Sequence, residues 1–327
     1  MKVKIGIIGC GHMGRTHGLI LRQDGRVELV GVMDIDRARA ERLAEELETR
    51  AFEKLDDLLH EGLTALYVTT PNARHVEPVL AALQAGVHVF SEKPMATSLK
   101  EARRILETVQ SSSLIYQIGF NRRFAPAYRF AREQIEKGFR PLSANVKMNR
   151  GELLNPPWVG DTSLTGGFLY ESTIHLLDMI RWLMGEVSEI ICQAQANVYK
   201  ELDDFAMILT FASGHHCAFS SSAHTSWAFP FERIELYGEH AQIATEEMEK
   251  VTYSPGLGEA VITRDYFQLS TAEKWGYRQE DELFVSALLG EGPSAVTAQD
   301  GYKAVELAEA VYRSARAGGE VVRLPLS

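Results

Sequence analysis

The chain has 327 residues, of which 45% are hydrophobic, and its 34 basic and 44 acidic residues give a formal net charge of −10. A chain of this length and apolar content is typical of two folded domains. The excess of acidic residues provides no basic surface for DNA, RNA or an anionic membrane. We therefore expect neither nucleic-acid nor membrane partners.

The beginning of the chain and its cysteines indicate a cytoplasmic protein. Met1–Lys4 leads directly into an apolar strand pattern, without the longer hydrophobic stretch and small-residue cleavage site of a secretory signal. The three cysteines, Cys10, Cys192 and Cys217, have spacings that fit neither a disulfide framework nor a zinc site. A reducing compartment and the absence of a metal site are the expectations.

A glycine-rich turn follows the first predicted strand, Lys4–Ile8, and precedes a predicted helix. The turn, Gly9–Gly14, reads Gly-x-Gly-x-x-Gly. Its candidate cofactor-binding residues are Gly9, Gly11, His12, Met13 and Gly14. In a dinucleotide-binding fold the first glycine allows the tight turn. The second lets backbone N–H groups approach a pyrophosphate, and the third lets helix and strand pack closely. The alternative is an ordinary glycine turn.

The second predicted strand, Val27–Met33, is followed by an acid that favours NAD as the cofactor. Asp34 lies 34 − 14 = 20 residues beyond the last glycine of the turn. A dinucleotide fold places its ribose-binding acid at this offset, where the carboxylate binds both ribose hydroxyls and repels a 2′-phosphate. We expect NAD rather than NADP, a preference that Arg37 and Arg39 could soften.

The continuing alternation of strand and helix predicts a parallel, doubly wound sheet. After the strand Ala65–Val68 come four residues that we expect at the cofactor or substrate, because loops at strand carboxyl ends line the ligand crevice of such sheets. They are Thr70, Pro71, Asn72 and His75. Simple turn chemistry and a solvated helix start are the alternatives for these residues.

The strand Val87–Phe90 leads into Glu92, Lys93 and Pro94. An isolated Glu-Lys-Pro is more often a surface turn, but its position at a strand end of this sheet makes Lys93 a candidate acid or base. Glu92 could pair with the lysine, and both are expected near the cofactor.

The segment Thr165–Asp178 places three ionisable side chains among apolar residues. If it is one helix, Glu171, His175 and Asp178 lie at i, i+4 and i+7 and share a face. Buried ionisable groups are costly unless they are paired or used. The alternative is structural: a satisfied core histidine, and Asp178 paired with Arg181 or another base.

Together these motifs resemble the glucose–fructose oxidoreductase, inositol dehydrogenase and rhizopine-catabolism (Gfo/Idh/MocA) family, over nearly the whole chain. The resemblance rests on the glycine turn, Asp34, the Thr70–His75 loop, Glu92-Lys93-Pro94 and the segment with His175. It implies an N-terminal Rossmann domain that binds NAD or NADP. It also implies a C-terminal α+β domain on a large open sheet, and cyclic polyols or sugars as substrates.

The resemblance also implies roles for individual residues. Lys93 matches the family's lysine, His175 its catalytic histidine, and Glu171 the position usually held by aspartate. The chain departs from the family pattern at Glu171 and at Thr173, which stands where glycine is common. These departures indicate a reshaped pocket and leave the substrate open.

We place the domain boundary at residue 120, with a Rossmann domain at 1–120 and a substrate-binding and oligomerisation domain at 121–327. Arg122 and Arg123 follow the boundary and are expected mainly to pair with carboxylates. Beyond them a helix precedes consecutive strands, which predict a largely antiparallel sheet. In Phe205–Phe211 both strand faces are apolar, so a homodimer or homotetramer through this sheet is expected, in keeping with the family.

Two further residues are substrate-binding candidates. Arg150 and Trp158 lie in the stretch that enters the segment with His175, where an aromatic ring and polar groups could hold a sugar. The resulting hypothesis is an NAD-dependent dehydrogenase in which Lys93, His175 and Glu171 act on a secondary alcohol, in either proton-accepting order. The alternatives are an NAD-assisted glycoside-cleaving enzyme and a non-catalytic dinucleotide-binding sensor.

Overall fold

The computed structural model of the chain describes residues 2–150 and 157–326, with side chains described for 2–150 and 159–326. The chain forms two compact units. The first contains Met1–Phe120 and Tyr277–Val305, and the second contains Asn121–Gly276 and Glu306–Ser327. The sequence analysis also places a boundary after residue 120. It assigns residues 277–305 to the second domain, 121–327, whereas in the structure they belong to the first unit.

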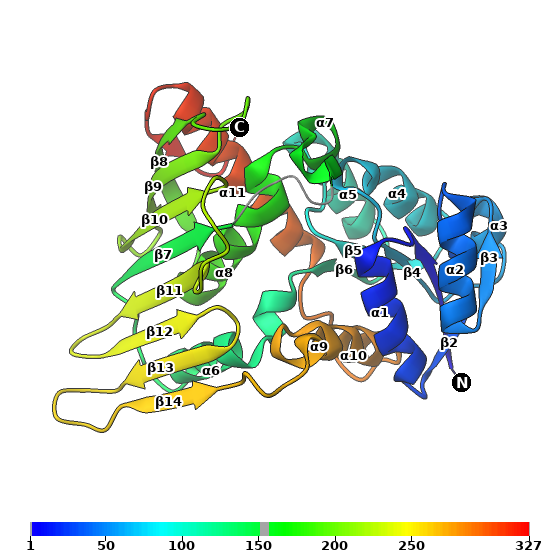
Figure 1. Ribbon diagram of the computed structural model, residues 1–327, viewed down its shortest axis with the longest axis horizontal. Coiled ribbons are helices and arrows are strands. Elements are labelled where there is room, and N and C mark those ends of the chain that lie inside the picture. The colour runs from blue at the N-terminus through cyan, green and yellow to red at the C-terminus, as the bar shows by residue number, and fades with distance from the viewer. Residues whose placement is uncertain (1, 151–156, 327) are drawn as a thin grey trace. The chain divides into compact units, whose positions relative to one another are not determined.

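The first unit is built on a six-stranded parallel sheet with the order β3-β2-β1-β4-β5-β6 (Figure 1). Its strands are β1 Val3–Ile8, β2 Val27–Met33, β3 Arg50–Phe52, β4 Ala65–Val68, β5 His88–Glu92 and β6 Tyr116–Gly119. This is the strand order of a doubly wound dinucleotide-binding sheet, in which the order reverses between β1 and β4. The predicted parallel sheet is confirmed.

Two helices of the first unit, α2 and α5, begin at side-chain caps. Asp36 accepts the backbone N–H of Arg39 at the start of α2, and Ser98 accepts that of Glu101 at the start of α5. The helical elements are α1 His12–Gln23, α2 Arg37–Leu47, α3 Leu55–Leu59, the 3₁₀ turn η1 Asn72–Arg74, α4 Val76–Gln84, α5 Leu99–Gln110 and α10 Tyr277–Leu288.

The return of α10 to the first unit has an apolar cause. Phe284 of this helix is fully buried, with its ring centroid 5.6 Å from those of Tyr67 on β4 and Phe90 on β5. The rings of Tyr67 and Phe90 are themselves stacked at 4.5 Å. Burial of these large rings is favourable in proportion to the apolar area removed from water. Aromatic packing therefore joins α10 to a sheet built from the first 120 residues.

The second unit is built on a nine-stranded sheet with the order β14-β13-β12-β11-β7-β10-β9-β8-β15. All its pairings are antiparallel except that of β10 with β7. Its strands are β7 Ser143–Asn149, β8 Val187–Gln195, β9 Asp204–Phe211, β10 His216–Ser222, β11 Glu232–Tyr237, β12 Gln242–Glu246, β13 Lys250–Ser254, β14 Ile262–Asp265 and β15 Val322–Arg323. The predicted, mostly antiparallel sheet is confirmed.

One face of this sheet is covered by helices (Figure 1). In the figure α6 and α8 lie along it, and contacts join α6 to β12 and β13, and α8 to β7. The helical elements are η2 Asn121–Phe124, α6 Pro126–Glu136, η3 Pro157–Gly160, α7 Thr162–Thr165, the π-helical turn η4 Leu169–Thr173, α8 Ile174–Met184, α9 Thr271–Lys274 and α11 Ala298–Arg316. The residues of α11 are divided between the two units at Val305.

Over residues 2–150 and 157–326, no helix combines the length and apolar content that crossing a membrane requires. Over the same ranges, no group of three or more His, Cys, Asp or Glu side chains could hold a metal ion.

Candidate active site

The glycine turn after β1 has the geometry that a bound pyrophosphate needs. Gly9 has a φ of +96°, and a Cβ atom there would lie 2.6 Å from the Thr69 carbonyl group. A Cβ atom on Gly14 would lie 2.0 Å from the Gly9 oxygen, so both positions require glycine. Gly11, the N-cap of α1, faces open space and carries no side-chain cap. The first N–H groups of α1 are therefore open to an anion.

The acid after β2 is oriented by this same turn. Asp34 accepts the backbone N–H of Cys10 at 2.7 Å with one oxygen and that of Asp36 at 2.8 Å with the other. Burial, with the charge of Asp34 adding to it, raises the pKa of the Cys10 thiol to about 12, so the thiol stays protonated. A carboxylate fixed beside the glycine turn fits the hydroxyl groups of an adenosine ribose.

The loop after β4 lies at the carboxyl edge of the sheet, beside the glycine turn. Thr69 donates its hydroxyl to the Gly9 oxygen at 2.7 Å, and the buried Thr70 hydroxyl has no hydrogen-bond partner among the described residues. Asn72, in η1, is buried. Pro71 is the N-cap of η1. An unsatisfied hydroxyl at this edge fits a cofactor that supplies its partner.

His75 lies inside the first unit, between two of its loops. It is fully buried, and its ring nitrogens lie 2.8 Å from the Pro94 oxygen and 2.7 Å from the Thr70 oxygen. Burial lowers the pKa of His75, an effect that the two backbone hydrogen bonds only partly offset. The ring therefore joins the loop after β4 to the turn after β5, and its predicted contact with the cofactor stays a prediction.

The turn after β5 presents Lys93. The lysine is partly buried and its peptide bond to Pro94 is cis. The backbone N–H of Lys93 donates to Glu92 Oε2 at 3.1 Å. Glu92 is buried, and its other oxygen, Oε1, lies 3.1 Å from His17 Nε2. Both oxygens of Glu92 are thus engaged inside the first unit, and its predicted contact with the cofactor stays a prediction.

Two residues that the sequence analysis does not identify, His17 of α1 and Asp281 of α10, support this turn through Glu92. His17 of α1 is fully buried, and its Nδ1 lies 2.8 and 3.0 Å from the two carboxylate oxygens of Asp281 in α10. The only sequence signal for His17 is a histidine on the apolar face of α1, three residues after Gly14. Asp281 lies 264 residues further along the chain and has no local signal.

In the second unit, the segment with Glu171 and His175 is not one regular α-helix. Gly167, at a φ of +107°, precedes the π-helical turn η4, and a Cβ atom there would lie 2.4 Å from the Tyr312 hydroxyl. The predicted single α-helical face of Glu171, His175 and Asp178 is wrong, because a π turn adds a residue and changes the register between Glu171 and His175. Turns of this kind are frequent at functional sites.

Glu171 is held by Arg150, the residue that follows β7. Arg150 Nη1 lies 3.5 Å from Glu171 Oε1 and donates to the hydroxyl of Ser172 at 2.7 Å. The guanidinium of Arg150 also lies 5.5 Å from the ring centroid of Trp227. The structure thus brings together two predicted site residues, Arg150 and Glu171. His175, partly buried at the start of α8, follows them in the same unit.

The third ionisable residue of the segment is structural. Asp178 is fully buried and accepts two hydrogen bonds from Arg123, at 2.7 and 2.6 Å. The neighbouring Arg122 binds Glu232 in the same way, so the expected pairing of both arginines with carboxylates is confirmed. Bidentate pairs of this kind add geometric specificity. Arg123 therefore fixes the helix that carries His175.

Two further residues that the sequence analysis singled out are Thr173 and Trp158. Thr173 is fully buried, and its hydroxyl lies 2.8 Å from that of Ser221 on β10, which in turn donates to the Met148 oxygen. The threonine that replaces the family's usual glycine is thus bonded to the sheet. The backbone of Trp158 lies in η3, and its side chain, a predicted substrate contact, lies outside the described residues.

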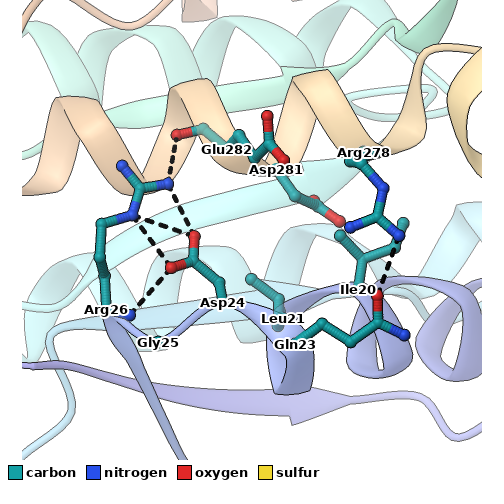
Figure 2. A pocket seen from close by; sticks show the side chains of 9 residues that line it. All are labelled: Ile20, Leu21, Gln23, Asp24, Gly25, Arg26, Arg278, Asp281 and Glu282. Atoms are coloured by element: carbon teal, nitrogen blue, oxygen red, sulfur yellow. Dashed lines mark hydrogen bonds and ion pairs between the residues drawn. The ribbon is translucent and has the colours of Figure 1, made fainter.

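A separate cavity of about 260 Å³ lies between α1 and α10, and Figure 2 shows its polar lining. It is lined by Ile20, Leu21, Gln23, Asp24, Gly25, Arg26, Arg278, Asp281 and Glu282. Arg26 binds Asp24, and Arg278 donates to Gln23 at 2.9 Å. None of the predicted site residues lines the cavity, which lies by the carboxyl end of α1, away from the glycine turn.

The predicted residues therefore fall into two groups. The first unit contains the glycine turn, Asp34, the loop after β4, Glu92 and Lys93, and the second contains Arg150, Glu171 and His175. The first group shares one edge of a parallel sheet, where such sheets bind their ligands. The second group offers an imidazole and a carboxylate, the components of general acid–base catalysis.

Comparison with known proteins identifies both parts of the chain. The model of an oxidoreductase family with an NAD-binding Rossmann fold, Gfo/Idh/MocA, matches residues 3–120. The model of the C-terminal alpha/beta domain of the same oxidoreductase family matches residues 132–324. Inositol 2-dehydrogenase of Rhizobium meliloti (strain 1021) is 27% identical over 326 residues, which cover 96% of this chain and 97% of that protein.

Solved structures share the fold over the full length. Levoglucosan dehydrogenase in complex with NADH has a TM-score of 0.89 at 20% identity and covers 100% of both chains. The scyllo-inositol dehydrogenase from Lactobacillus casei, with bound NAD(H) and scyllo-inositol, has a TM-score of 0.83 at 22% identity and covers 99% of each chain. At these identities the likeness establishes a common fold.

Proposed function

The chain belongs to the Gfo/Idh/MocA family of NAD-dependent oxidoreductases, and we propose that it transfers a hydride between NAD and a secondary alcohol or ketone of a cyclic polyol or sugar. The chemistry of its relatives supports this substrate class, since the inositol 2-dehydrogenase aligns with nearly the whole chain. Bound NAD supplies the hydride acceptor or donor, and the protein supplies orientation, proton transfer and electrostatics.

The observation that carries the proposal is the position of Lys93. It follows β5 directly, at the same carboxyl edge of the sheet as the glycine turn after β1 and Thr70 after β4. Doubly wound sheets bind their ligands at this edge. A primary amine there is in the right part of the fold to meet a hydroxyl beside the nicotinamide.

The proposed roles follow from the chemistry of the side chains. His175 takes the hydroxyl proton as the hydride leaves the carbon, and Lys93 donates a hydrogen bond to the same oxygen and stabilises its developing negative charge. Glu171, anchored by Arg150, orients His175. An exchange of roles between Lys93 and His175 gives the same overall reaction.

The same geometry supports NAD as the preferred cofactor. Asp34 is fixed by the N–H groups of Cys10 and Asp36, so its carboxylate keeps one position at the end of β2. A 2′-phosphate there would meet a negative charge. We propose that Asp34→Ala weakens NAD binding and brings the NAD and NADP affinities closer together.

A homodimer or homotetramer through the nine-stranded sheet is part of the proposal. Ile191 of β8 and Ile208 of β9 are cross-strand neighbours, 38% and 50% exposed, and Ala218 of β10 is exposed next to Ile208. This apolar row is the kind of surface that a second copy covers. Light scattering at micromolar concentration tests it, and a monomer there contradicts it.

The proposed reaction is tested by following NADH absorbance over a panel of cyclitols, sugars and glycosides. We expect NADH to accumulate with at least one cyclitol or sugar, and Lys93→Ala to lower turnover by about 10²- to 10⁴-fold while NAD binding is kept. The exposed Lys100→Ala is the matched control and should keep wild-type turnover.

Three results contradict parts of this proposal in different ways. Cleavage of a glycoside without net NADH favours the NAD-assisted glycoside-cleaving alternative, in which oxidation is transient. NAD binding without turnover of any substrate favours the sensor. Wild-type turnover in Lys93→Ala would remove Lys93 from the reaction.

A further inference from the structure

The interior of the first unit contains a row of interacting ionisable side chains that ends at Lys93. His17 lies between two carboxylates, with its Nδ1 2.8 Å from Asp281 Oδ1 and its Nε2 3.1 Å from Glu92 Oε1. The three residues are 0%, 1% and 6% exposed, in the order His17, Asp281 and Glu92. Three ionisable groups in a core are costly to bury unless each is paired.

With Glu92 and Asp281 ionised, the pairing requires His17 to carry a positive charge. Burial raises the pKa of Asp281, and the charge and hydrogen bond of His17 oppose that rise. Carboxylates only accept hydrogen bonds, so both ring nitrogens must donate, which only the imidazolium does. Burial opposes this charge, but the charges of Asp281 and Glu92 and their hydrogen bonds outweigh it and raise the pKa of His17 well above its ordinary value. Burial likewise opposes ionisation of Glu92, but the hydrogen bond and charge of His17, and then those of Lys93, lower its pKa.

The ionised Glu92 holds the turn that presents the lysine. Its second oxygen accepts the backbone N–H of Lys93 at 3.1 Å. Its carboxyl group lies over Gly119 of β6, where a Cβ atom would come within 3.2 Å of the Glu92 carboxyl carbon. A side chain at 119 would therefore displace the carboxylate. On the other side of Lys93, His75 Nδ1 lies 2.8 Å from the Pro94 oxygen.

We propose that His17 and Asp281 are positioning residues for Lys93, which act through the carboxylate of Glu92. The inference rests on the proposed function in one respect, the role of Lys93 in turnover. Asp281 orients and charges His17, His17 fixes Glu92, and Glu92 fixes the backbone at Lys93. A segment from the far end of the chain, α10, thereby sets the geometry of a residue at the cofactor edge of the sheet.

A neighbour in α10 provides a matched control. Glu280 is fully buried next to Asp281 in the sequence, and its carboxyl oxygens have no hydrogen-bond partner among the described residues. Burial, then the charge of Glu92, raises its pKa well above the ordinary value, which favours the neutral acid. Glu280→Gln keeps the shape of this side chain and leaves His17 and Glu92 in place.

The experiment compares His17→Gln and Asp281→Asn with Glu280→Gln and the wild type. Hydrogen exchange at the Lys93 amide reports whether Glu92 still accepts it, and needs neither cofactor nor turnover. We expect about a tenfold loss of protection at Lys93 in the first two variants, with the amides of β1 unchanged. We expect kcat on the polyol of the panel to fall by about 10- to 100-fold while NAD affinity is kept.

The pH profile supplies a readout that a general loss of stability does not move. The groups that face Glu92 are His17 from α1, Asp281 and Glu280 from α10, His75 before α4, and the adjacent Lys93. In His17→Gln, Glu92 loses its cationic partner and binds a proton at a higher pH. The acidic limb of kcat therefore moves to higher pH in His17→Gln and stays in place in Glu280→Gln.

The outcomes separate this inference from the proposed function. Wild-type protection at Lys93 and wild-type kcat in His17→Gln and Asp281→Asn overturn it. Equal loss of protection at Lys93 and across β1 also overturns it, because His17 then braces the whole unit. If the wild type reduces no NAD with any polyol, the proposed function is contradicted but this inference is not. Hydrogen exchange at the Lys93 amide then still decides whether His17 and Asp281 position Lys93.

Discussion

The turn that carries Lys93 and the segment that carries His175 are held by different chemistry. At Lys93 the anchors are two buried histidines, His17 through Glu92 and His75 through the Pro94 oxygen. At His175 the main anchors are guanidinium groups, with Arg123 on Asp178 and Arg150 on Glu171.

This difference predicts where pH and where mutation act most strongly. Histidine changes its charge near neutral pH, whereas a guanidinium group stays charged throughout. We therefore expect pH to change the anchoring of the Lys93 turn more than the anchoring of the His175 segment. The second unit should instead be sensitive to removal of one partner of an ion pair, which leaves the other charge buried.

The largest effect is expected at His175 itself. His175→Ala removes the proposed proton acceptor and should lower kcat by about 10²- to 10⁴-fold, the usual contribution of a general base. NAD affinity should stay within a few-fold of the wild type, because the cofactor residues belong to the first unit. Steady-state NADH formation and a binding titration measure the two quantities. His60→Ala, an exposed histidine of α3's carboxyl end, serves as the control.

The next effect is on stability and concerns Arg123. Arg123→Ala leaves Asp178 buried without its bidentate partner and should lower the free energy of unfolding by about 3–5 kcal/mol. Urea unfolding measures the loss. Lys137→Ala breaks an exposed i,i+4 pair with Glu133 in the same unit and should cost less than about 1 kcal/mol. Equal losses in the two variants would show that the buried Arg123–Asp178 pair contributes no more to the free energy of unfolding than the exposed pair does.

A double variant sharpens this test. Arg123→Met with Asp178→Leu replaces both charges by apolar groups of similar size, and such replacements of buried pairs are often neutral or stabilising. We expect it to recover most of the stability lost in Arg123→Ala. A double variant as unstable as the single one would mean that the site requires the charges themselves.

The parts of the site that the sequence predicts are those encoded by neighbouring residues. The glycine turn, Asp34 and Lys93 each follow a strand within a few residues, so a local pattern is enough to place them on one edge of the sheet. The family match at 3–120 and 132–324 extends this reading to the fold class. The roles of the site residues stay predictions.

The parts that the sequence does not predict depend on distance along the chain or on small changes of register. His17 and Asp281 are 264 residues apart, and the return of α10 depends on where Phe284 finds its aromatic neighbours. The π turn before His175 keeps the apolar pattern of an α-helix, so periodicity alone does not reveal the added residue. The strands β13 and β14 contain mainly polar residues, and no continuous apolar pattern marks them in the sequence.

The smallest predicted effect concerns the pH dependence of stability, and the two histidines beside Lys93 should show opposite signs. The pKa of His17 is raised in the folded protein, so its stabilisation is complete below the unfolded value near 6.5 and is lost as pH rises through the folded value. The stability advantage of the wild type over His17→Gln should shrink above pH 6.5, by at most about 1.4 kcal/mol per pH unit.

His75 provides the opposing case. Burial lowers its pKa, so its contribution to stability is lost as pH falls below the unfolded value near 6.5. The advantage of the wild type over His75→Gln should therefore shrink from pH 7 to pH 5. Urea unfolding at each pH measures both differences. Two advantages that both shrink as pH rises would mean that both rings are cationic, and two that both shrink as pH falls would mean that both rings are neutral.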